Sequence, residues 1–133
     1  QVWLDDGVPI VAKFYRPQRW STEAIQEEQD FATELAAREL PVVAPLVFNG
    51  RTLHEHGGFQ FALTPRRGGR TPELDDPETL QWMGRFIARI HAVGQVKPFA
   101  HRPTLDIESF AYEPVQFLLD GEFVPDDLYD TYA

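Results

Sequence analysis

The clearest chemical signal in the sequence is Lys13, which stands inside the apolar run 11–15. An ammonium group beside apolar side chains must meet a carboxylate or a phosphate, because leaving it unpaired costs free energy. Fifteen residues later, Glu28 falls on the otherwise apolar stripe of a predicted helix. This spacing predicts a lysine and a glutamate that face each other at a phosphate-binding site. The alternative is a surface strand whose lysine extends into water.

A strand and a helix are predicted to position this pair. A short strand at the start of the chain turns at Gly7 into a second strand over residues 8–15. Since side chains alternate along a strand, Val11 and Lys13 share one face. The helix that follows begins at a serine or threonine N-cap and occupies residues 21–38.

Further strands are predicted before residue 64. Asn49-Gly50 between residues 46–48 and 51–53 is the strongest hairpin signal in the chain. Gly57-Gly58 predicts a second turn, and residues 59–63 read as a buried strand. Together these segments predict an antiparallel sheet of about five strands with one helix on one face, an α+β fold.

The composition changes after this sheet. Residues 64–72 are rich in Pro, Gly and Arg within an acidic chain, which is typical of a linker between lobes. A helix is then predicted to start at Asp75-Asp76-Pro77-Glu78 and to end at Gly94, and a shorter one is predicted near residues 107–119. The predicted organisation is a small lobe over 1–63, a hinge over 64–72 and the start of a helical lobe over 73–133.

Charge and composition exclude several classes of protein. The net charge is −9, with 12 Lys and Arg against 21 Asp and Glu, so the chain lacks the basic face that a nucleic-acid binder needs. It has no Cys, which excludes disulfides and thiolate metal sites and fits a reducing compartment. No apolar run is long enough to span a membrane. We therefore expect a cytoplasmic protein that binds neither nucleic acid nor a membrane.

Five segments stand out by their order and spacing: V-A-K-F-Y-R-P-Q-R-W, I-Q-E-E-Q-D-F, P-V-V-A-P-L-V-F-N-G-R-T-L, G-F-Q-F-A-L-T-P-R-R-G-G-R and G-R-F-I-A-R-I-H. Together they resemble the YihE/RdoA family of stress response kinases. That family belongs to the aminoglycoside phosphotransferase and choline kinase superfamily, which has a protein-kinase-like fold. The resemblance extends to about Tyr112 and implies a small lobe, a hinge and the helical beginning of a large lobe.

The resemblance implies a role for each matching residue of the small lobe. Lys13 would hold the α- and β-phosphates of ATP, and Glu28 would pair with it. Glu27 is the competing choice for that partner, but it lies off the apolar stripe of the helix. Val11, on the face of Lys13, would pack against the adenine ring.

The resemblance also implies that residues 64–69 form a hinge whose backbone binds adenine. The carbonyl of Thr64 is the candidate acceptor. Pro65 has no N–H to donate, so the donor would be Arg66 or Arg67.

Parts of the family pattern fall outside the sequence. The loop that covers the nucleotide would precede Gln1, and the catalytic loop and the metal-binding Asp would follow Ala133. We therefore expect a piece of a longer protein, with no catalytic or metal-binding residue in this segment, which alone should be inactive. The resemblance implies ATP and Mg²⁺ as cofactors and a protein or small-molecule hydroxyl group as the second substrate.

Three functions remain open for the whole protein. The first is a stress-response Ser/Thr protein kinase. The second is a kinase for a small molecule of the aminoglycoside, choline or homoserine type, which an acidic pocket in the large lobe would favour. The third is a non-catalytic nucleotide-binding or interaction module, which degenerate catalytic residues would favour.

The other polar clusters have simpler interpretations. His54 and His56 share a strand face but lack a third ligand nearby, so we expect exposed strand residues rather than a metal site. His91 ends an amphipathic helix and is expected to be a hydrogen-bonded core residue. The arginines of residues 66–70 are expected to be solvated. The acids of residues 126–130 fit a helix N-terminus.

Overall fold

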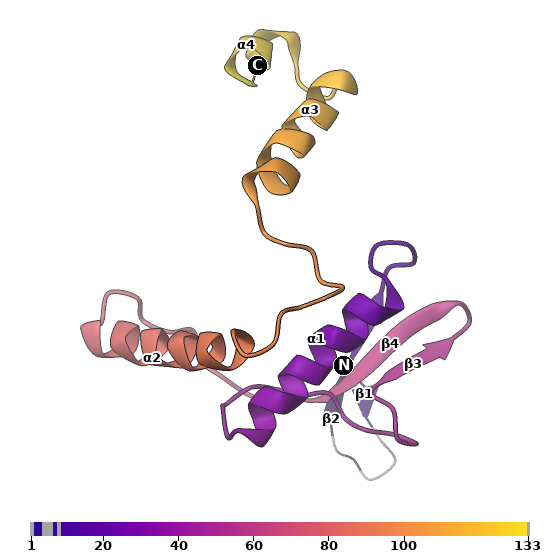
Figure 1. The fold of residues 1–133 in the computed structure, drawn as a ribbon, viewed down its shortest axis with the longest axis vertical. Coiled ribbons are helices and arrows are strands. Elements are labelled where there is room, and N and C mark those ends of the chain that lie inside the picture. Colours follow the sequence, from indigo (N-terminus) through magenta and orange to yellow (C-terminus); the bar gives the residue numbers. More distant parts are fainter. Residues whose placement is uncertain (1, 4–6, 8, 133) are drawn as a thin grey trace. The chain divides into compact units, whose positions relative to one another are not determined.

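The first compact unit of the chain contains every predicted site residue. The structure, a computed structural model, describes residues 2–3, 7 and 9–132. The chain divides between Arg102 and Pro103 into two compact units (Figure 1).

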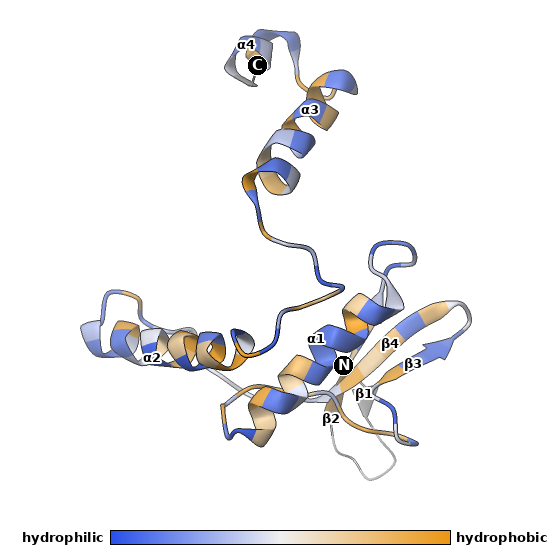
Figure 2. Ribbon diagram, viewed as in Figure 1, coloured by the Kyte–Doolittle hydropathy of each residue, from blue (hydrophilic) through white to orange (hydrophobic). Residues whose placement is uncertain are grey.

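The first unit is built on an antiparallel sheet. Within the described residues the sheet has four strands in the order β1-β2-β4-β3. The strands are β1 (Val2–Trp3), β2 (Pro9–Tyr15), β3 (Leu53–His56) and β4 (Phe59–Pro65). Apolar residues dominate the middle of β4 (Figure 2). The α+β small-lobe fold class is confirmed.

The register between β2 and β4 places four residues on one face of the sheet. Lys13 lies opposite Ala62, and Val11 lies opposite Thr64. Residues directly opposite each other in an antiparallel pair share a face, as do residues two apart on one strand. The shared face predicted for Val11 and Lys13 is therefore present, and it also carries a residue from the predicted hinge.

The predicted strand at residues 46–48 is wrong. A single bridge between Phe48 and Arg51 closes the turn at Asn49-Gly50, and no ladder extends from it. Both turn residues have positive φ, as the hairpin signal requires, but Pro45 just before the segment has no N–H to offer a ladder. The described sheet consequently has one strand fewer than expected. The turn predicted at Gly57-Gly58 is confirmed between β3 and β4.

The first helix follows its predicted bounds closely. Helix α1 (Thr22–Ala37) begins after Ser21, whose side chain accepts the backbone N–H of Ala24 at 3.1 Å. That bond satisfies one of the free N–H groups of the first turn. The cap thus fixes where the helix starts and, with it, the position of Glu28 two turns later.

Two buried clusters hold α1 in place. The first joins α1 to the sheet, and the second joins the end of α1 to helix α2 (Pro77–Gly94). Both use apolar side chains at helical spacing, which is why the stripe was visible in the sequence. The first cluster contains Tyr15, Ile25 and Ala62, with Trp20 and Leu53 packed against it. The second contains Leu35, Leu40 and Val93, with Phe31, Val42 and Ile90.

Helix α2 and the second unit confirm the later helix predictions. Asp76 caps α2 by accepting the N–H groups of Glu78 and Thr79. The second unit has a π-helical turn, η1 (Glu108–Tyr112), followed by α3 (Glu113–Asp120). A 3-10 turn, η2 (Asp126–Leu128), and α4 (Tyr129–Tyr132) follow. None of the described helices is long and apolar enough to cross a membrane.

The predicted hinge begins inside the sheet. Strand β4 runs to Pro65, so the first two residues of the range 64–72 are paired with β2. Residues 66–70 are exposed and follow directly. The division into lobes at 64–72 stays a prediction.

Candidate functional site

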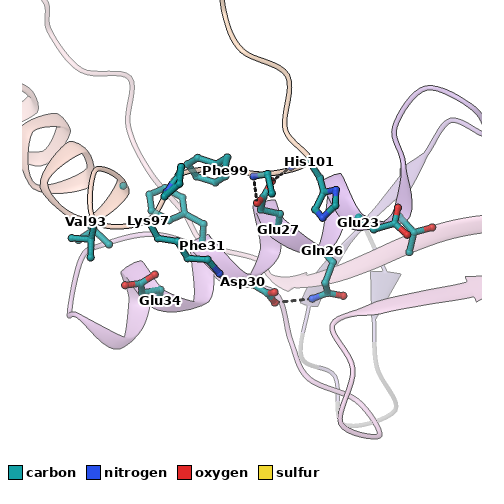
Figure 3. Close-up of a pocket in the computed structure, with 15 residues that line it drawn as sticks. Glu23, Gln26, Glu27, Asp30, Phe31, Glu34, Val93, Lys97, Phe99 and His101 are labelled. Carbon is teal, nitrogen blue, oxygen red and sulfur yellow. Dashed lines mark hydrogen bonds between the residues drawn. The ribbon is translucent and has the colours of Figure 1, made fainter.

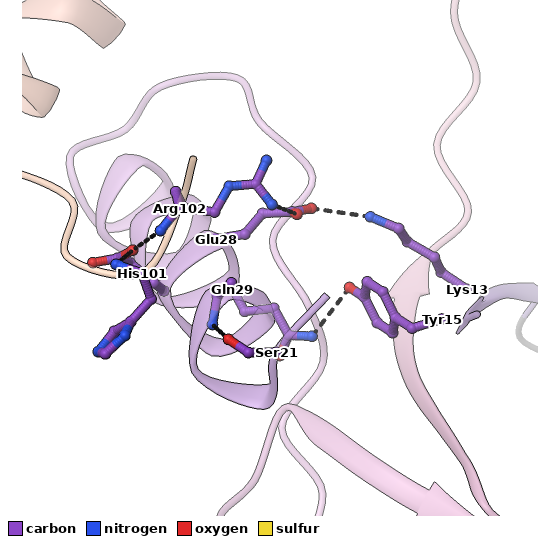
Figure 4. Close-up of polar contacts among 9 residues, drawn as sticks. Lys13, Tyr15, Ser21, Glu28, Gln29, His101 and Arg102 are labelled. Atoms are coloured by element: carbon purple, nitrogen blue, oxygen red, sulfur yellow. Dashed lines mark hydrogen bonds and ion pairs between the residues drawn. The ribbon is translucent and has the colours of Figure 1, made fainter. Parts of the chain in front are cut away.

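Lys13 and Glu28 form the predicted ion pair. The Nζ of Lys13 lies 3.0 Å from Oε1 of Glu28 and donates a hydrogen bond to it (Figure 4). The two side chains are 54% and 40% exposed, so the pair lies at the surface of a cleft rather than in the core. Strand β2 supplies the lysine, and α1 supplies the glutamate.

The surroundings keep Lys13 charged. Partial burial lowers the pKa of Lys13, but the hydrogen bond to Glu28 and the electrostatic interactions with Tyr15 and Glu28 outweigh it, so the pKa lies above its usual value of 10.5. The ammonium also lies 4.8 Å from the centre of the Tyr15 ring. A lysine in this state is a permanent cation at neutral pH and suits binding of an anion.

A cavity of about 240 Å³ opens beside the pair. Lys13, Glu28 and Thr64 all line it, so the structure brings three of the five predicted site residues together. This volume is below the range of roughly 300–1,000 Å³ for complete small-molecule sites, as expected for half of a cleft. The other lining residues are Tyr15, Gln29, Ala32, Val43, Pro45 and Ala62.

The remaining two predicted site residues lie outside this cavity. Val11 is on the face of Lys13 but is 40% exposed and does not line the cavity. Arg66 is exposed, and its backbone N–H donates to the carbonyl of Pro9 at 3.3 Å. That bond occupies the N–H of Arg66, which was one of the two candidates to donate a hydrogen bond to adenine. The N–H of Arg67 is therefore the better candidate donor.

Gln29 is a site residue that the sequence did not suggest. It is 3% exposed, and its amide donates to the Tyr15 hydroxyl at 3.3 Å. Its Oε1 atom is buried without a partner in the described part of the chain. An amide in the middle of a helix gives no sequence signal of burial, because glutamine is usually exposed. Gln29 ties α1 to β2 two residues from Lys13.

A segment after α2 binds the same helix. The carboxylate of Glu27 accepts the backbone N–H groups of Ala100, His101 and Arg102 at 2.7, 2.9 and 2.9 Å. The sequence offered Glu27 as the competing partner for Lys13, and Glu28 takes that role instead. The contact joins residues more than 70 positions apart and follows no periodic pattern, so the sequence around Glu27 or around residues 100–102 does not predict it.

Arg102 completes this second contact. Its guanidinium donates to Oε2 of Glu28 at 3.1 Å (Figure 4). Its Cζ lies 4.7 Å from the centre of the Trp20 ring. The glutamate of the predicted pair therefore has a second cationic partner that the sequence analysis missed.

The larger cavity of the first unit lies elsewhere. It measures about 730 Å³ and lies between α1 and the segment that follows α2 (Figure 3). Its lining mixes acidic side chains, such as Glu23 and Glu34, with apolar ones, such as Phe31 and Phe99. It shares no lining residue with the cavity beside Lys13. The chemistry of a phosphate site therefore favours the smaller cavity.

The histidines differ from expectation. His54 is half-buried rather than exposed: its ring lies 5.5 Å from that of Phe61, and its Nε2 is buried without a partner among the described residues. His56 is exposed as expected. His91 is exposed rather than buried, because the stripe of α2 turns Val93 and Ile90 inward instead. Within residues 2–3, 7 and 9–132 no cluster of three acidic, histidine or cysteine side chains is arranged to hold a metal.

Glu27 is expected to titrate at an unusually low pH. The N–H of Ala100, followed by those of His101 and Arg102, lowers the pKa of Glu27 below its usual value of 4.5. Because the folded-state pKa is lowered, the contact stabilises the fold above about pH 4.5 and is lost as the pH falls through the lowered folded value. Amide proton shifts of residues 100–102, measured by NMR, should therefore stay constant down to about pH 4.5 and then move together.

The matched variant for this titration is Glu27→Gln. It keeps one acceptor oxygen and cannot ionise, so the joint transition at residues 100–102 should disappear. A wild-type midpoint at or above 4.5 would contradict the contact.

The fold and the ion pair define a class of protein. An antiparallel sheet that carries a lysine, paired with a glutamate on the helix that follows it, is the small-lobe arrangement of kinase-like phosphotransferases. The sequence model of the Phosphotransferase enzyme family matches residues 1–123, so the chain belongs to that family.

Similar curated proteins are named as kinases. The chain is 42% identical over 121 residues to "Stress response kinase A" of Salmonella choleraesuis (strain SC-B67) and to "Serine/threonine protein kinase RdoA" of Salmonella typhimurium, with 91% of this chain covered. It is 41% identical over 124 residues, 93% of its length, to "Stress response kinase A" of Escherichia coli (strain K12). The chain spans 37% of the length of those Salmonella proteins and 38% of the Escherichia coli protein.

Proposed function

We propose that this chain is the N-terminal part of an ATP-dependent Ser/Thr protein kinase of the stress-response type. The observation that supports the proposal most is the 3.0 Å pair between Lys13 and Glu28 beside a cavity that also reaches the end of β4. Relatives named as stress response kinases add to that support.

In this proposal Lys13 binds the phosphates, and Glu28 orients the ammonium group of Lys13. An ammonium has three N–H donors, and Glu28 takes one, which leaves donors for the α- and β-phosphates of ATP. The stem of Lys13 is fixed by β2, and α1 holds its partner, so the cation is positioned before the nucleotide arrives. Such preorganised charge is the main contribution that a protein makes to phosphoryl transfer.

The residues of this chain supply only part of the proposed reaction. Mg²⁺ would neutralise phosphate charge. Its ligands, and the residues of the catalytic loop, are proposed to lie outside this segment. The segment alone would then supply half of a cleft and transfer no phosphoryl group. A cytoplasmic location, expected from the absence of Cys, belongs to the same proposal.

Phosphoryl transfer by the full-length protein tests the proposed activity. Purified protein is incubated with γ-labelled ATP and Mg²⁺, once with a Ser/Thr-containing protein acceptor and once with an aminoglycoside, choline or homoserine. Labelled phosphoserine or phosphothreonine supports the protein kinase. Transfer only to a small molecule favours the alternative kinase, and nucleotide binding without any transfer favours a non-catalytic module.

The adenine ring is expected to bind to the backbone of residues 64–69. The carbonyl of Thr64 would accept the exocyclic amino group, and the N–H of Arg67 would donate, since the N–H of Arg66 is bonded to Pro9. A structure of the full-length protein with a non-hydrolysable ATP analogue checks this. Adenine that makes no hydrogen bond to this segment would refute the hinge.

A further inference from the structure

Two neighbouring carboxylates of α1 bind one short segment of the chain. Glu27 accepts three consecutive backbone N–H groups, those of residues 100–102. Glu28 accepts the guanidinium of Arg102 at 3.1 Å. Glu27 holds the backbone of Arg102, and Glu28 holds its side chain. The guanidinium therefore has little freedom to move away from the Glu28 carboxylate.

Glu28 is therefore shared between two cations. Its Oε1 atom meets Lys13 at 3.0 Å, and its Oε2 atom meets Arg102 at 3.1 Å (Figure 4). A carboxylate with one partner can rotate about its terminal torsion, whereas one with a partner on each oxygen has its plane fixed. Arg102 thus fixes the orientation in which Glu28 presents its other oxygen to Lys13.

The guanidinium is itself held by the core of the unit. It lies 4.7 Å from the centre of the Trp20 ring, and Trp20 packs against the buried cluster of Tyr15, Ile25 and Ala62. A flat, delocalised cation suits stacking on an aromatic face better than an ammonium does. The position of Arg102 is consequently determined by the same packing that positions α1 on the sheet.

The charges of the three residues have a second consequence. Lys13, Glu28 and Arg102 together carry one positive charge, and the Glu27 carboxylate that holds the backbone of Arg102 brings the sum of the four residues to zero. By sharing the carboxylate, Arg102 leaves more of the Lys13 charge available to an anion in the adjoining cavity.

We propose that Arg102 is a positioning residue for the phosphate-binding lysine: it orients Glu28 and shares the negative charge of that carboxylate with Lys13. The proposal rests on the proposed kinase function, since it concerns how that site binds ATP. Arg102 acts through Glu28 and does not itself reach the cavity beside Lys13.

Steady-state kinetics of the full-length protein with ATP tests this role. Arg102→Gln should lower kcat/KM for ATP about tenfold, the scale of one charge-assisted hydrogen bond, through a higher KM and a lower kcat. Arg102→Lys keeps the charge but not the flat face over Trp20, so a loss of only about threefold is expected. Arg38→Gln is the matched control, because Arg38, at the C-cap of α1, forms an exposed pair with Glu34, and neither residue lines the cavity beside Lys13.

A double-variant comparison distinguishes positioning from general stabilisation. In a Glu28→Gln background, Arg102→Gln should cause little further loss, because its route to Lys13 is already removed. A full tenfold loss in that background, or a kcat/KM for Arg102→Gln within twofold of wild type, would overturn the proposal.

The melting temperature of every variant is measured beside its kinetics. If Arg102→Gln does not fold, Arg102→Lys decides: a reduced kcat/KM at an unchanged melting temperature supports the proposal, and wild-type kinetics overturns it. A wild-type protein that transfers no phosphate from ATP would refute the proposed function as well. An active wild type with unaffected Arg102 variants would refute only the positioning role.

Discussion

Replacing Lys13 with methionine should abolish phosphoryl transfer by the full-length protein while leaving its fold intact. Methionine keeps the length of the apolar stem and removes the ammonium, so the phosphates of ATP would lose a preorganised cation. Removal of one such electrostatic contact typically lowers kcat by roughly 100- to 1,000-fold. The measurement is kcat and KM for ATP, with circular dichroism as the check on the fold.

The stability of this variant should change little. The Lys13–Glu28 pair is 54% and 40% exposed, and such pairs contribute only about 0–1 kcal/mol to folding because water screens them. Lys97→Met is the matched control, since Lys97 is exposed and lies outside the cavity beside Lys13. Wild-type turnover by Lys13→Met, or an equal loss in the control, would contradict the assignment of the site.

The parts of the fold that the sequence predicted are those governed by local rules. The N-caps Ser21 and Asp76 each precede an apolar stripe, and both helices begin there. The pairing of Lys13 with Glu28 was visible because two charges interrupt otherwise apolar patterns, one with the period of a strand and one with the period of a helix.

The parts that escaped prediction depend on contacts distant in sequence. Glu27 and Arg102 meet across 75 residues, and Arg102 lies in an irregular segment with no periodicity to interpret. The turn signal at Asn49-Gly50 was correct, yet the strand expected before it did not form, because a turn sequence specifies a bend and not the pairing that must extend from it.

The same tertiary packing should make Ile25 the most sensitive apolar position of α1. Its side chain is 1% exposed and belongs to the cluster that joins α1 to the sheet. Ile25→Ala would remove three carbons from a closely packed site and leave a cavity, which typically costs about 2–4 kcal/mol. Urea denaturation of the chain, followed by circular dichroism, should show a lower midpoint at an unchanged slope.

Ile87→Ala provides the same chemical change at a half-exposed position of α2, where the side chain is 50% exposed. Its effect on the midpoint should be a small fraction of that of Ile25→Ala, since little apolar area there leaves water on folding. Equal losses in the two variants would show that the Ile25 cluster does not hold α1. The position of Glu28 beside Lys13 would then need another explanation, because Ile25 lies one turn before Glu28 and fixes the height of that turn above the sheet.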